Sequence, residues 1–405
     1  MQTALRFTIH DRLEGALART GTLVTPHGEI QTPAFIPVGT KATLKALTPE
    51  QLLATGAQAV LVNAYHLYLR PGHELIDRAG GVHAFMNWKG PIFSDSGGFQ
   101  VMSLGVGFKK VVDMEGEPDQ QSTKKKKDKL AWIDNDGVRF KSHLDGSMHR
   151  FTPELSMQIQ HGIGADITFA FDELTTLFHD YAYQVESLEQ RTHPWAVRSL
   201  TEHQRLNAER SHRPPQALFG VVQGADHEDL RRQCAKFLGA MDFDGYGLGG
   251  ALRKSNIGNN VRWMCEELPE DKPRHMLGIS EPDDIFDCIE NGADTFDCVS
   301  PARVGRNGAL YTQNGRVNIT RLEFKEKFEP FDAACDCYTC QNFTAAYLHH
   351  LFKADELLSN TLATIHNERF VVKLVDDIRA SISDGTFYEF KTSFLQSYYS
   401  YSKIE

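Results

Sequence analysis

Residues 295 to 308 read TFDCVSPARVGRNG, and the first part of this pattern recurs along the chain and decides the fold. The stretch begins as a short apolar strand with one carboxylate, Asp297, and breaks at Pro301 into a predicted loop with two arginines and two glycines. A carboxylate at the C-terminal end of a strand, beside cations that can hold phosphates, suits chemistry on a nucleic acid. The simpler interpretation is that Asp297 caps the next helix and that Arg303 and Arg306 are solvated surface residues.

Short apolar segments that alternate with predicted helices occur through most of the chain. They are residues 34–38, 59–63, 92–95, 167–172, 217–224, 245–250, 275–279 and 294–297. Strands that alternate with helices at this spacing indicate a parallel sheet. About eight repeats favour an α/β fold closed into a (β/α)8 TIM barrel, here with additional N-terminal β-strands, and a doubly wound open sheet is the alternative.

Polar residues and a glycine stand where five of these predicted strands end. They are Asp95, Asp172, Gln223, Gly250 and Asp297. In a (β/α)8 barrel the active site is built at the C-terminal ends of the strands. A single polar residue at a strand end is often only a cap, but five that converge on one face indicate a functional site.

A second pattern, C-x-C-x-x-C, is formed by Cys335, Cys337 and Cys340. Tetrahedral zinc needs four nitrogen or sulfur ligands, and closely spaced cysteines supply three of them. Candidates for the fourth ligand are His349, His350 and His366. Because three thiolates and one imidazole leave no position for water, the predicted site is closed and structural. Three free thiols are the alternative.

The chain has 405 residues, which allows one large domain or two medium ones. We predict the barrel, with its N-terminal strands and an insertion around residues 105–150, over residues 1–330. A zinc-binding helical subdomain packed on the barrel is predicted over residues 331–405. The insertion contains the run Lys124 to Lys127, which is interpreted as a solvated tip rather than as a nucleic-acid contact.

The formal charge of −10 argues against a general polyanion binder, so any nucleic-acid contact must come from a local patch. Residues 301–322 are one candidate, because they contain four arginines and no acid. The seven cysteines, an odd number, argue against a disulfide framework and fit a reducing cytoplasm. The polar first 23 residues predict no signal peptide, and no segment approaches the length of a membrane span.

Several motifs occur together and in one order. They are FSDSGGFQVM at 93–102, FGVVQG at 219–224, the stretch from FDC to RNG at 296–308, and the cysteine cluster. With these motifs the chain resembles the tRNA-guanine transglycosylase family, bacterial type, from about Phe7 to Tyr398. Members exchange guanine in tRNA for a 7-deazaguanine base on a (β/α)8 barrel with a zinc subdomain. The resemblance therefore implies tRNA as partner, base exchange at the anticodon wobble position in queuosine biosynthesis, and one structural Zn²⁺.

The resemblance also implies roles for single residues. Asp297 would be the nucleophile that attacks C1′ of the target ribose and displaces guanine, which leaves a covalent enzyme–tRNA intermediate. Asp95 would act as general acid and base, with Asn63 holding it in place. Arg303 and Arg306 would hold phosphates near the target nucleotide.

The same resemblance implies how the base is bound after it leaves the stack. Asp172 would accept hydrogen bonds from its N1–H and amino group, and Gln223 and the Gly250 N–H would donate to its O6. Phe99 and Leu277 would sandwich the ring. For zinc, the matching fourth ligand is His366, beside the three cysteines. Members of the family commonly form homodimers, and the implied location is the cytoplasm.

One stretch departs from the family pattern. Members that use preQ1 usually continue Gly-Gly with Leu-Ala-Val-Gly-Glu, whereas residues 249–255 here read GGALRKS. The acid that supports recognition of a cationic amine is thus absent, and Ala251 takes the first substrate-binding position of the run. Leu174 also replaces a small residue, while Val38 resembles the preQ1-using members. The predicted base is preQ1, with queuine or preQ0 as alternatives.

Two other functions are weighed against base exchange. A retaining glycoside hydrolase also needs two carboxylates, but it gives no reason for the zinc cluster or for Gln223 beside Gly250. A non-catalytic tRNA-binding subunit would be expected to lose Asp297 or Asp95, and both are present.

Overall fold

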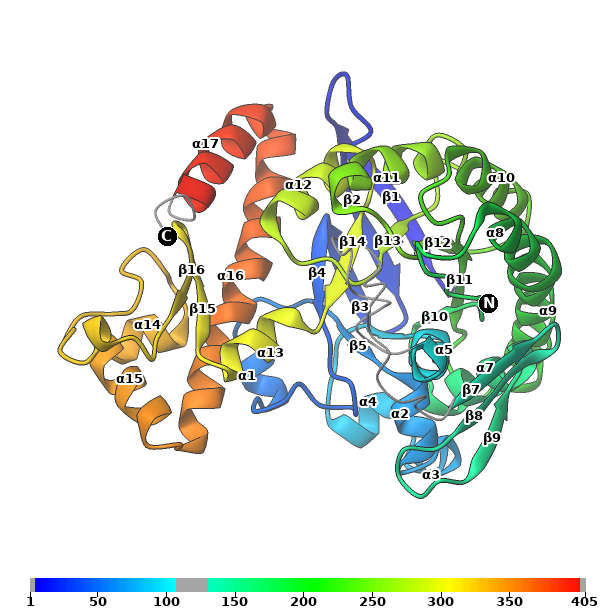
Figure 1. Cartoon of the computed structure of the whole chain (residues 1–405), viewed down its shortest axis with the longest axis horizontal. Coiled ribbons are helices and arrows are strands. Elements are labelled where there is room, and N and C mark those ends of the chain that lie inside the picture. Colours follow the sequence, from blue (N-terminus) through cyan, green and yellow to red (C-terminus); the bar gives the residue numbers. More distant parts are fainter. Residues whose placement is uncertain (1–3, 107–129, 401–405) are drawn as a thin grey trace.

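The computed structural model describes residues 4–106 and 130–400. Its largest sheet is parallel and runs in the order β4-β14-β13-β12-β11-β10-β6-β5. These strands are β4 (Ala34–Pro37), β5 (Val60–Val62), β6 (Ile92–Ser94), β10 (Ile167–Phe169), β11 (Ala217–Val222), β12 (Gly245–Leu248), β13 (Arg274–Met276) and β14 (Thr295–Cys298). A parallel bridge between Val38 and Leu61 joins β4 to β5 and closes the sheet (Figure 1). The prediction of a (β/α)8 barrel is therefore confirmed.

Helices connect the barrel strands. They are α1 (Pro49–Leu53), α2 (Ala64–Leu69), α3 (His73–Arg78), α4 (Val82–Met86), α5 (Gly98–Val106), α7 (Pro153–Ile163), α8 (Tyr181–Ser187), the π-helical turn η1 (Leu188–Thr192), α9 (His193–Glu209), α10 (Glu228–Gly239), η2 (Lys254–Asn256), α11 (Ile257–Cys265) and α12 (Pro282–Glu290). Helix α1 starts with a capping box, in which Thr48 accepts from the Gln51 N–H and the Gln51 side chain accepts from the Thr48 N–H. Pro49 fills the first turn, where its missing N–H costs nothing.

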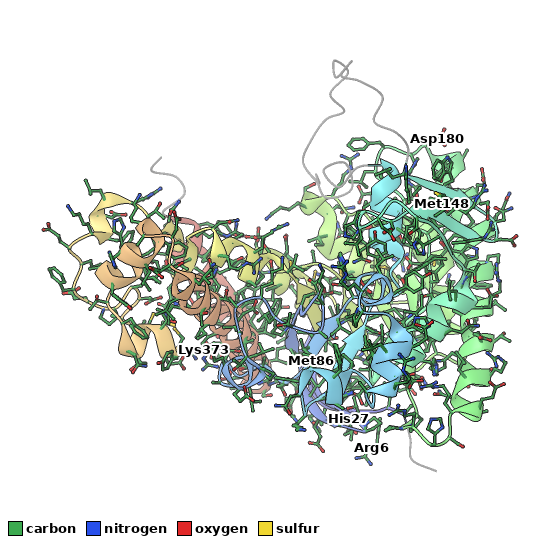
Figure 2. The ribbon with its side chains drawn as sticks, turned by 90° about the horizontal axis from the view of Figure 1, so that it is seen from below. Arg6, His27, Met86, Met148, Asp180 and Lys373 are labelled. Carbon is green, nitrogen blue, oxygen red and sulfur yellow. The ribbon has the colours of Figure 1, made fainter. Side chains whose placement is uncertain are left out.

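The barrel interior is filled by apolar side chains rather than by solvent. Phe93, Phe169 and Phe219 meet there, each at most 2% exposed. An antiparallel sheet of β1 (Arg6–Arg12), β2 (Arg19–Thr25) and β3 (Gly28–Thr32) adds Leu23 and Ile30 to the same cluster. This sheet lies at the N-terminal end of the barrel. Figure 2 shows that end near His27, in the β2–β3 turn, and the opposite end near Asp180, in the loop after β10.

The insertion contains a second antiparallel sheet, made of β7 (Ala131–Asp134), β8 (Gly137–Lys141) and β9 (Met148–Phe151). Strand β8 matches the hairpin strand that the alternating sequence 137–143 predicts. The run Lys124 to Lys127 lies outside the described residues, so its predicted role is left as a prediction.

The C-terminal region surrounds one long helix. Its elements are β15 (Ala309–Thr312), β16 (Gly315–Asn318), η3 (Leu322–Phe324), α14 (Tyr338–Asn342), α15 (Ala345–Lys353), α16 (Leu357–Ser383) and α17 (Phe387–Ser400). Helix α16 runs between the barrel and the small β15–β16 sheet (Figure 1). His349 and His350, two of the candidates for the fourth zinc ligand, lie on α15 and are not part of the cysteine cluster in the described residues. No helix within residues 4–106 and 130–400 combines the length and the hydropathy needed to cross a membrane.

One local prediction is wrong. Residues after Pro301 form helix α13 (Ser300–Arg306) instead of a loop. Pro301 suits a first helical turn because its φ is already helical. Gly305 then allows α13 to pack closely on α16, since a Cβ there would lie 3.0 Å from Asn367 Nδ2 and 3.1 Å from the Ala363 carbonyl. Asn367 also donates to the Pro301 carbonyl at 3.0 Å, so tertiary packing decides the helix.

Candidate active site and metal centre

Asp297 lies at the C-terminal end of β14, with 13% of its side chain exposed. Its Oδ1 is 3.1 Å from His275 Nε2 on β13 and accepts from the Gly278 N–H at 3.2 Å. It does not cap α13, whose N-cap residue is Val299. His275 was missed by the sequence analysis. The alternation of side chains along an extended segment could have indicated it, because His275 and Leu277 are two residues apart and therefore point to the same side.

Asp95 follows β6 directly and accepts three hydrogen bonds from uncharged groups. The donors are the Asn63 amide, the Gln100 amide at 3.0 Å and the Ala64 N–H at 2.7 Å. Removal from solvent raises the pKa of Asp95 to about 6 against the opposing effect of these donors, and the negative charge of Asp297 adds to the rise. A carboxyl group with such a pKa can both give and take a proton near neutral pH.

Asp172 follows β10 and accepts from the Gln223 amide nitrogen at 2.6 Å. Removal from solvent raises its pKa to about 7, and the charges of Glu173 and Asp95 contribute. Gln223 Oε1 is buried without a hydrogen-bond partner among the described residues. This pair therefore offers a carboxylate acceptor and an amide whose hydrogen bonds can be rearranged around a planar polar ligand.

A glycine turn after β12 lies against this pair. Gly250 has a φ of +95°, and a Cβ there would lie 2.5 Å from Gln223 Oε1 and 2.9 Å from Arg231 Nη2. Only glycine fits at such a position. A Cβ on Gly249 would lie 3.3 Å from both Gln223 Nε2 and Leu277 Cδ1. Gln223, Leu277 and the backbone of the turn are thus neighbours.

Arg231, on α10, was also missed. Its side chain is fully buried beneath the turn, with Nη1 donating to the Gly249 carbonyl at 2.6 Å and Nε donating to the Ala225 carbonyl at 2.7 Å. Burial lowers the pKa of this guanidinium to about 10. The sequence signal is an arginine beside the apolar face of an amphipathic helix, next to Leu230 and Cys234. Arg231 fixes the carbonyls around the glycine turn.

The remaining predicted site residues lie on the elements that follow these strands. Ala251 is buried directly after the turn, and Phe99 lies on α5 with 37% exposure. Arg303 is exposed on α13, and Arg306 is half-buried and donates to the Ala302 carbonyl at 2.9 Å. The helix therefore presents at least one cation, Arg303, to solvent close to Asp297 in sequence.

The predicted metal ligands Cys335, Cys337, Cys340 and His366 come together in the C-terminal region. The distances from His366 Nδ1 to the three sulfurs are 3.6, 3.5 and 3.3 Å. Tetrahedral zinc bonds of about 2.3 Å to sulfur and about 2.0–2.1 Å to nitrogen place these atoms about 3.5 Å apart. His366 Nε2 is 2.7 Å from the Tyr311 carbonyl, which leaves Nδ1 as the free ligand atom. The donor set thus fits a closed zinc site.

A second group of possible metal ligands, His27, His83 and Asp166, lies at the other end of the barrel. Asp166 is 2.6 Å from His27 Nδ1 and 3.0 Å from His83 Nε2. The two imidazole rings stack with centroids 3.6 Å apart and an interplanar angle of 17°. Because both imidazoles already have the Asp166 carboxylate as partner, the group ties the β2–β3 turn to the barrel.

The fold and the site define a (β/α)8 barrel with a group of carboxylates at its C-terminal end and a separate Cys₃His cluster. The family model for queuine tRNA-ribosyltransferase matches residues 14–400. Queuine tRNA-ribosyltransferases from Thermoanaerobacter pseudethanolicus and Lactococcus lactis subsp. lactis are 45% and 44% identical over 398 residues, which cover 98% of this chain and 98% and 96% of theirs. The same enzyme from Symbiobacterium thermophilum is 43% identical over 403 residues, 98% of this chain and 92% of its own. The chain belongs to the queuine tRNA-ribosyltransferase family, and it is a pentosyltransferase.

Proposed function

We propose that the protein is a tRNA-guanine transglycosylase that exchanges guanine at the anticodon wobble position for a 7-deazaguanine base in queuosine biosynthesis. The observation that carries the proposal is the arrangement of two carboxylates, in which Asp297 is held through one oxygen and Asp95 has a pKa raised to about 6. A nucleophile and a proton-transfer group with separate environments are what a glycosyl transfer with two displacements requires. Membership of the family supports the same assignment.

In the first displacement, Asp297 Oδ2 forms a bond to C1′ of the ribose as the C1′–N9 bond of guanine breaks. The electron pair goes to the guanine, which takes a proton from Asp95. In the second displacement the incoming base loses a proton to Asp95, its nitrogen bonds to C1′, and the C1′–Oδ2 bond breaks. Asp172, Gln223 and the Gly250 N–H hold the polar edge of each base in turn.

The base that we propose is preQ1, with queuine or preQ0 as alternatives. The basic residues that follow the glycine turn present little free positive charge to a cationic substituent. Arg253 Nε lies 3.1 Å from Asp226, and Lys254 Nζ lies 3.3 Å from Asp283 and 3.6 Å from Asp284. Since each cation has an acid as partner, these two residues do not exclude an aminomethyl group near the turn.

The decisive test is the covalent intermediate. The wild-type protein, incubated with tRNA bearing guanine at the wobble position, should give an adduct that survives denaturing electrophoresis and is chased by preQ1. Asp297→Asn should lower exchange at least about 10³-fold and give no adduct, because an amide is a poor nucleophile. An adduct in that variant would contradict the assignment of Asp297. Hydrolysis of simple aryl glycosides by the wild type would favour the glycoside hydrolase instead.

We also propose that the Cys₃His cluster holds one structural zinc. When bound, the metal cross-links the α14 segment to α16 and supplies no chemistry to the exchange reaction. Metal analysis should find about one zinc per chain. Chelation, or the Cys340→Ser substitution, should lower the melting temperature strongly, because the energy of metal binding contributes to folding. A protein free of metal with unchanged thermal stability would refute this site.

The partners that we propose are tRNA, with Arg303 and Arg306 on its phosphates, and a second copy of the chain. The outer face of α14 and α15 supports a homodimer, since Tyr338 and Tyr347 are 54% and 40% exposed. Phe343 stacks on Tyr347 in the same patch, with ring centroids 5.6 Å apart. Aromatic residues are enriched at protein interfaces. The action on tRNA makes the cytoplasm the expected location.

A further inference from the structure

We propose that His275 is a positioning residue for the nucleophile, which holds one oxygen of Asp297 through both displacements and leaves the other free to attack C1′. This inference rests on the proposed function, because it assigns His275 a role toward a nucleophilic Asp297. His275 has no predicted contact with the substrate, and it would act only through the carboxylate.

The geometry places His275 between two residues of the neighbouring strand. Nδ1 is 2.9 Å from Thr295 Oγ1, and Nε2 is 3.1 Å from Asp297 Oδ1. Thr295 is the register partner of His275 across the β13–β14 pair, and Asp297 is two residues further on the same face. The imidazole therefore spans from one inward-facing side chain of β14 to the next.

The ring has little freedom to move. His275 is fully buried, and its ring centroid lies 5.2 Å from both Phe93 and Phe169 in the barrel interior. Apolar contacts around the ring prevent it from turning toward water. Among the described residues, the partners of its two nitrogens are therefore Thr295 and Asp297.

The two partners also determine the tautomer. A carboxylate can only accept, so Nε2 must carry the hydrogen that faces Asp297. The Thr295 hydroxyl can then donate to Nδ1, which completes the donor and acceptor set of the neutral ring. The Gly278 N–H gives Oδ1 a second donor at 3.2 Å, and the described residues give Oδ2 no hydrogen-bond partner. The two hydrogen bonds thus hold the carboxylate through Oδ1, and Oδ2 is available to attack C1′.

The same two donors serve both half-reactions. As Oδ2 bonds to C1′, Oδ1 becomes the carbonyl oxygen of the aspartyl ester. When the incoming base attacks and the C1′–Oδ2 bond breaks, the electron pair returns to the carboxylate, and negative charge develops again on Oδ1. Fixed N–H donors stabilise a leaving group of this kind. Loss of the His275 donor should therefore slow breakdown of the adduct by the incoming base, and loss of the fixed orientation of Asp297 should slow its formation.

The test measures single-turnover adduct formation and the chase of isolated adduct by the base. His275→Phe keeps a ring in the barrel and should slow both steps by about 10²-fold, the order found when one such donor is removed. The KM for tRNA should change less than about threefold. In His275→Gln the amide can donate to Asp297 and accept from Thr295. Both steps should therefore be at least about tenfold faster than in His275→Phe.

Substitutions of Thr295 test the same hydrogen bonds with a smaller expected effect, because they leave the imidazole of His275 in place. Thr295→Val removes the hydroxyl at nearly constant shape and should slow both steps by about 3- to 10-fold, whereas Thr295→Ser should stay near wild type. A wild-type adduct together with His275→Phe or Thr295→Val rates within twofold of wild type would overturn the role of His275 alone. Absence of any adduct in the wild type would overturn the proposed function and this role together. Should His275→Phe fail to fold, the Thr295 pair decides by the same criteria.

Discussion

The two ends of the barrel use the same residue type in opposite ways. At the N-terminal end, Asp294 is fully buried and accepts from Arg19 Nε at 2.9 Å, Arg19 Nη2 at 2.8 Å and the Arg274 N–H at 2.8 Å. Asp166 is 2% exposed and binds His27, His83 and the Ile92 N–H. Each aspartate lies just before one strand and accepts from a backbone N–H of the strand beside it in the sheet, so these carboxylates join neighbouring strands.

At the C-terminal end, the described residues give Asp95 and Asp172 no ion pair. Their partners are amides and a backbone N–H, which satisfy hydrogen bonds without neutralising charge. Removal from solvent raises their pKa values to about 6 and about 7. Burial acts in the same direction on Asp166, but the hydrogen bonds from His27 and His83 outweigh it and lower the pKa.

The difference separates carboxylates that stabilise the fold from carboxylates that, in the proposed function, bind a substrate. A buried acid paired with a cation has its charge neutralised and gains nothing from a ligand. A shielded acid without a cation is unfavourable in the free protein, and a base that donates hydrogen bonds to it can relieve that cost. Perturbed pKa values of this kind are common at functional sites.

The largest effect should come from breaking the N-terminal pair. Asp294→Asn leaves the Arg19 guanidinium, which is 3% exposed, buried without its counter-charge. Removal of one partner of a buried pair costs about 3 to 5 kcal/mol. Chemical denaturation should show this loss in the free energy of unfolding. The activity of the remaining folded protein should equal that of wild type, and a loss below about 1 kcal/mol would place Asp294 outside the group of stabilising carboxylates.

Asp172→Asn should have the opposite effects, since it should raise the stability at pH 8 and lower the activity. In the folded protein the pKa of Asp172 is raised from 3.8 to about 7, so the wild type loses stability as pH rises from about 4 to about 7. At pH 8 the variant, which has no charge to bury, should be more stable by about 1 to 3 kcal/mol. Exchange should fall at least about tenfold, because an amide cannot accept from both donors of the base. A variant that is less stable than wild type at pH 8 would contradict the comparison.

How far the sequence predicts this arrangement differs between the two ends. Asp95, Asp172 and Asp297 follow apolar strands, and the period of the strands places them at one end of the barrel. That period can place His275 on an inward face, but it does not say which side chains the three aspartates contact. The contact between His275 and Asp297 depends on the register of two strands, and the place of Arg231 depends on the packing of α10 under the β12 turn. Register and helix packing are set by tertiary contacts between distant residues.

The prediction of a loop after Pro301, where the structure has helix α13, is wrong for a related reason. The glycines and arginines after Pro301 favour a loop when only local preferences are considered, and contacts with α16 favour the helix. Asp166 and Asp294 were not singled out from the sequence either, although each follows a Gly-Ala pair and precedes an apolar strand. Such a position is equally compatible with a turn residue, and only the buried partners reveal its role.

The smallest expected effect is the pH dependence that Asp95, whose partners are uncharged, gives to the reaction rates. This dependence should differ between formation of the adduct and its chase by the incoming base. In the proposed reaction guanine leaves with a proton from Asp95, so adduct formation should need the protonated form and fall about tenfold per pH unit above about pH 6. In the same proposal the incoming base gives its proton to Asp95, so the chase of isolated adduct should need the ionised form and rise as pH increases through the same value. Asp95→Asn should be slower in both steps and lose both slopes. If the two profiles bend in the same direction, or if the variant retains either bend, Asp95 does not transfer the proton, and its raised pKa reflects only its shielded place beside Asp297.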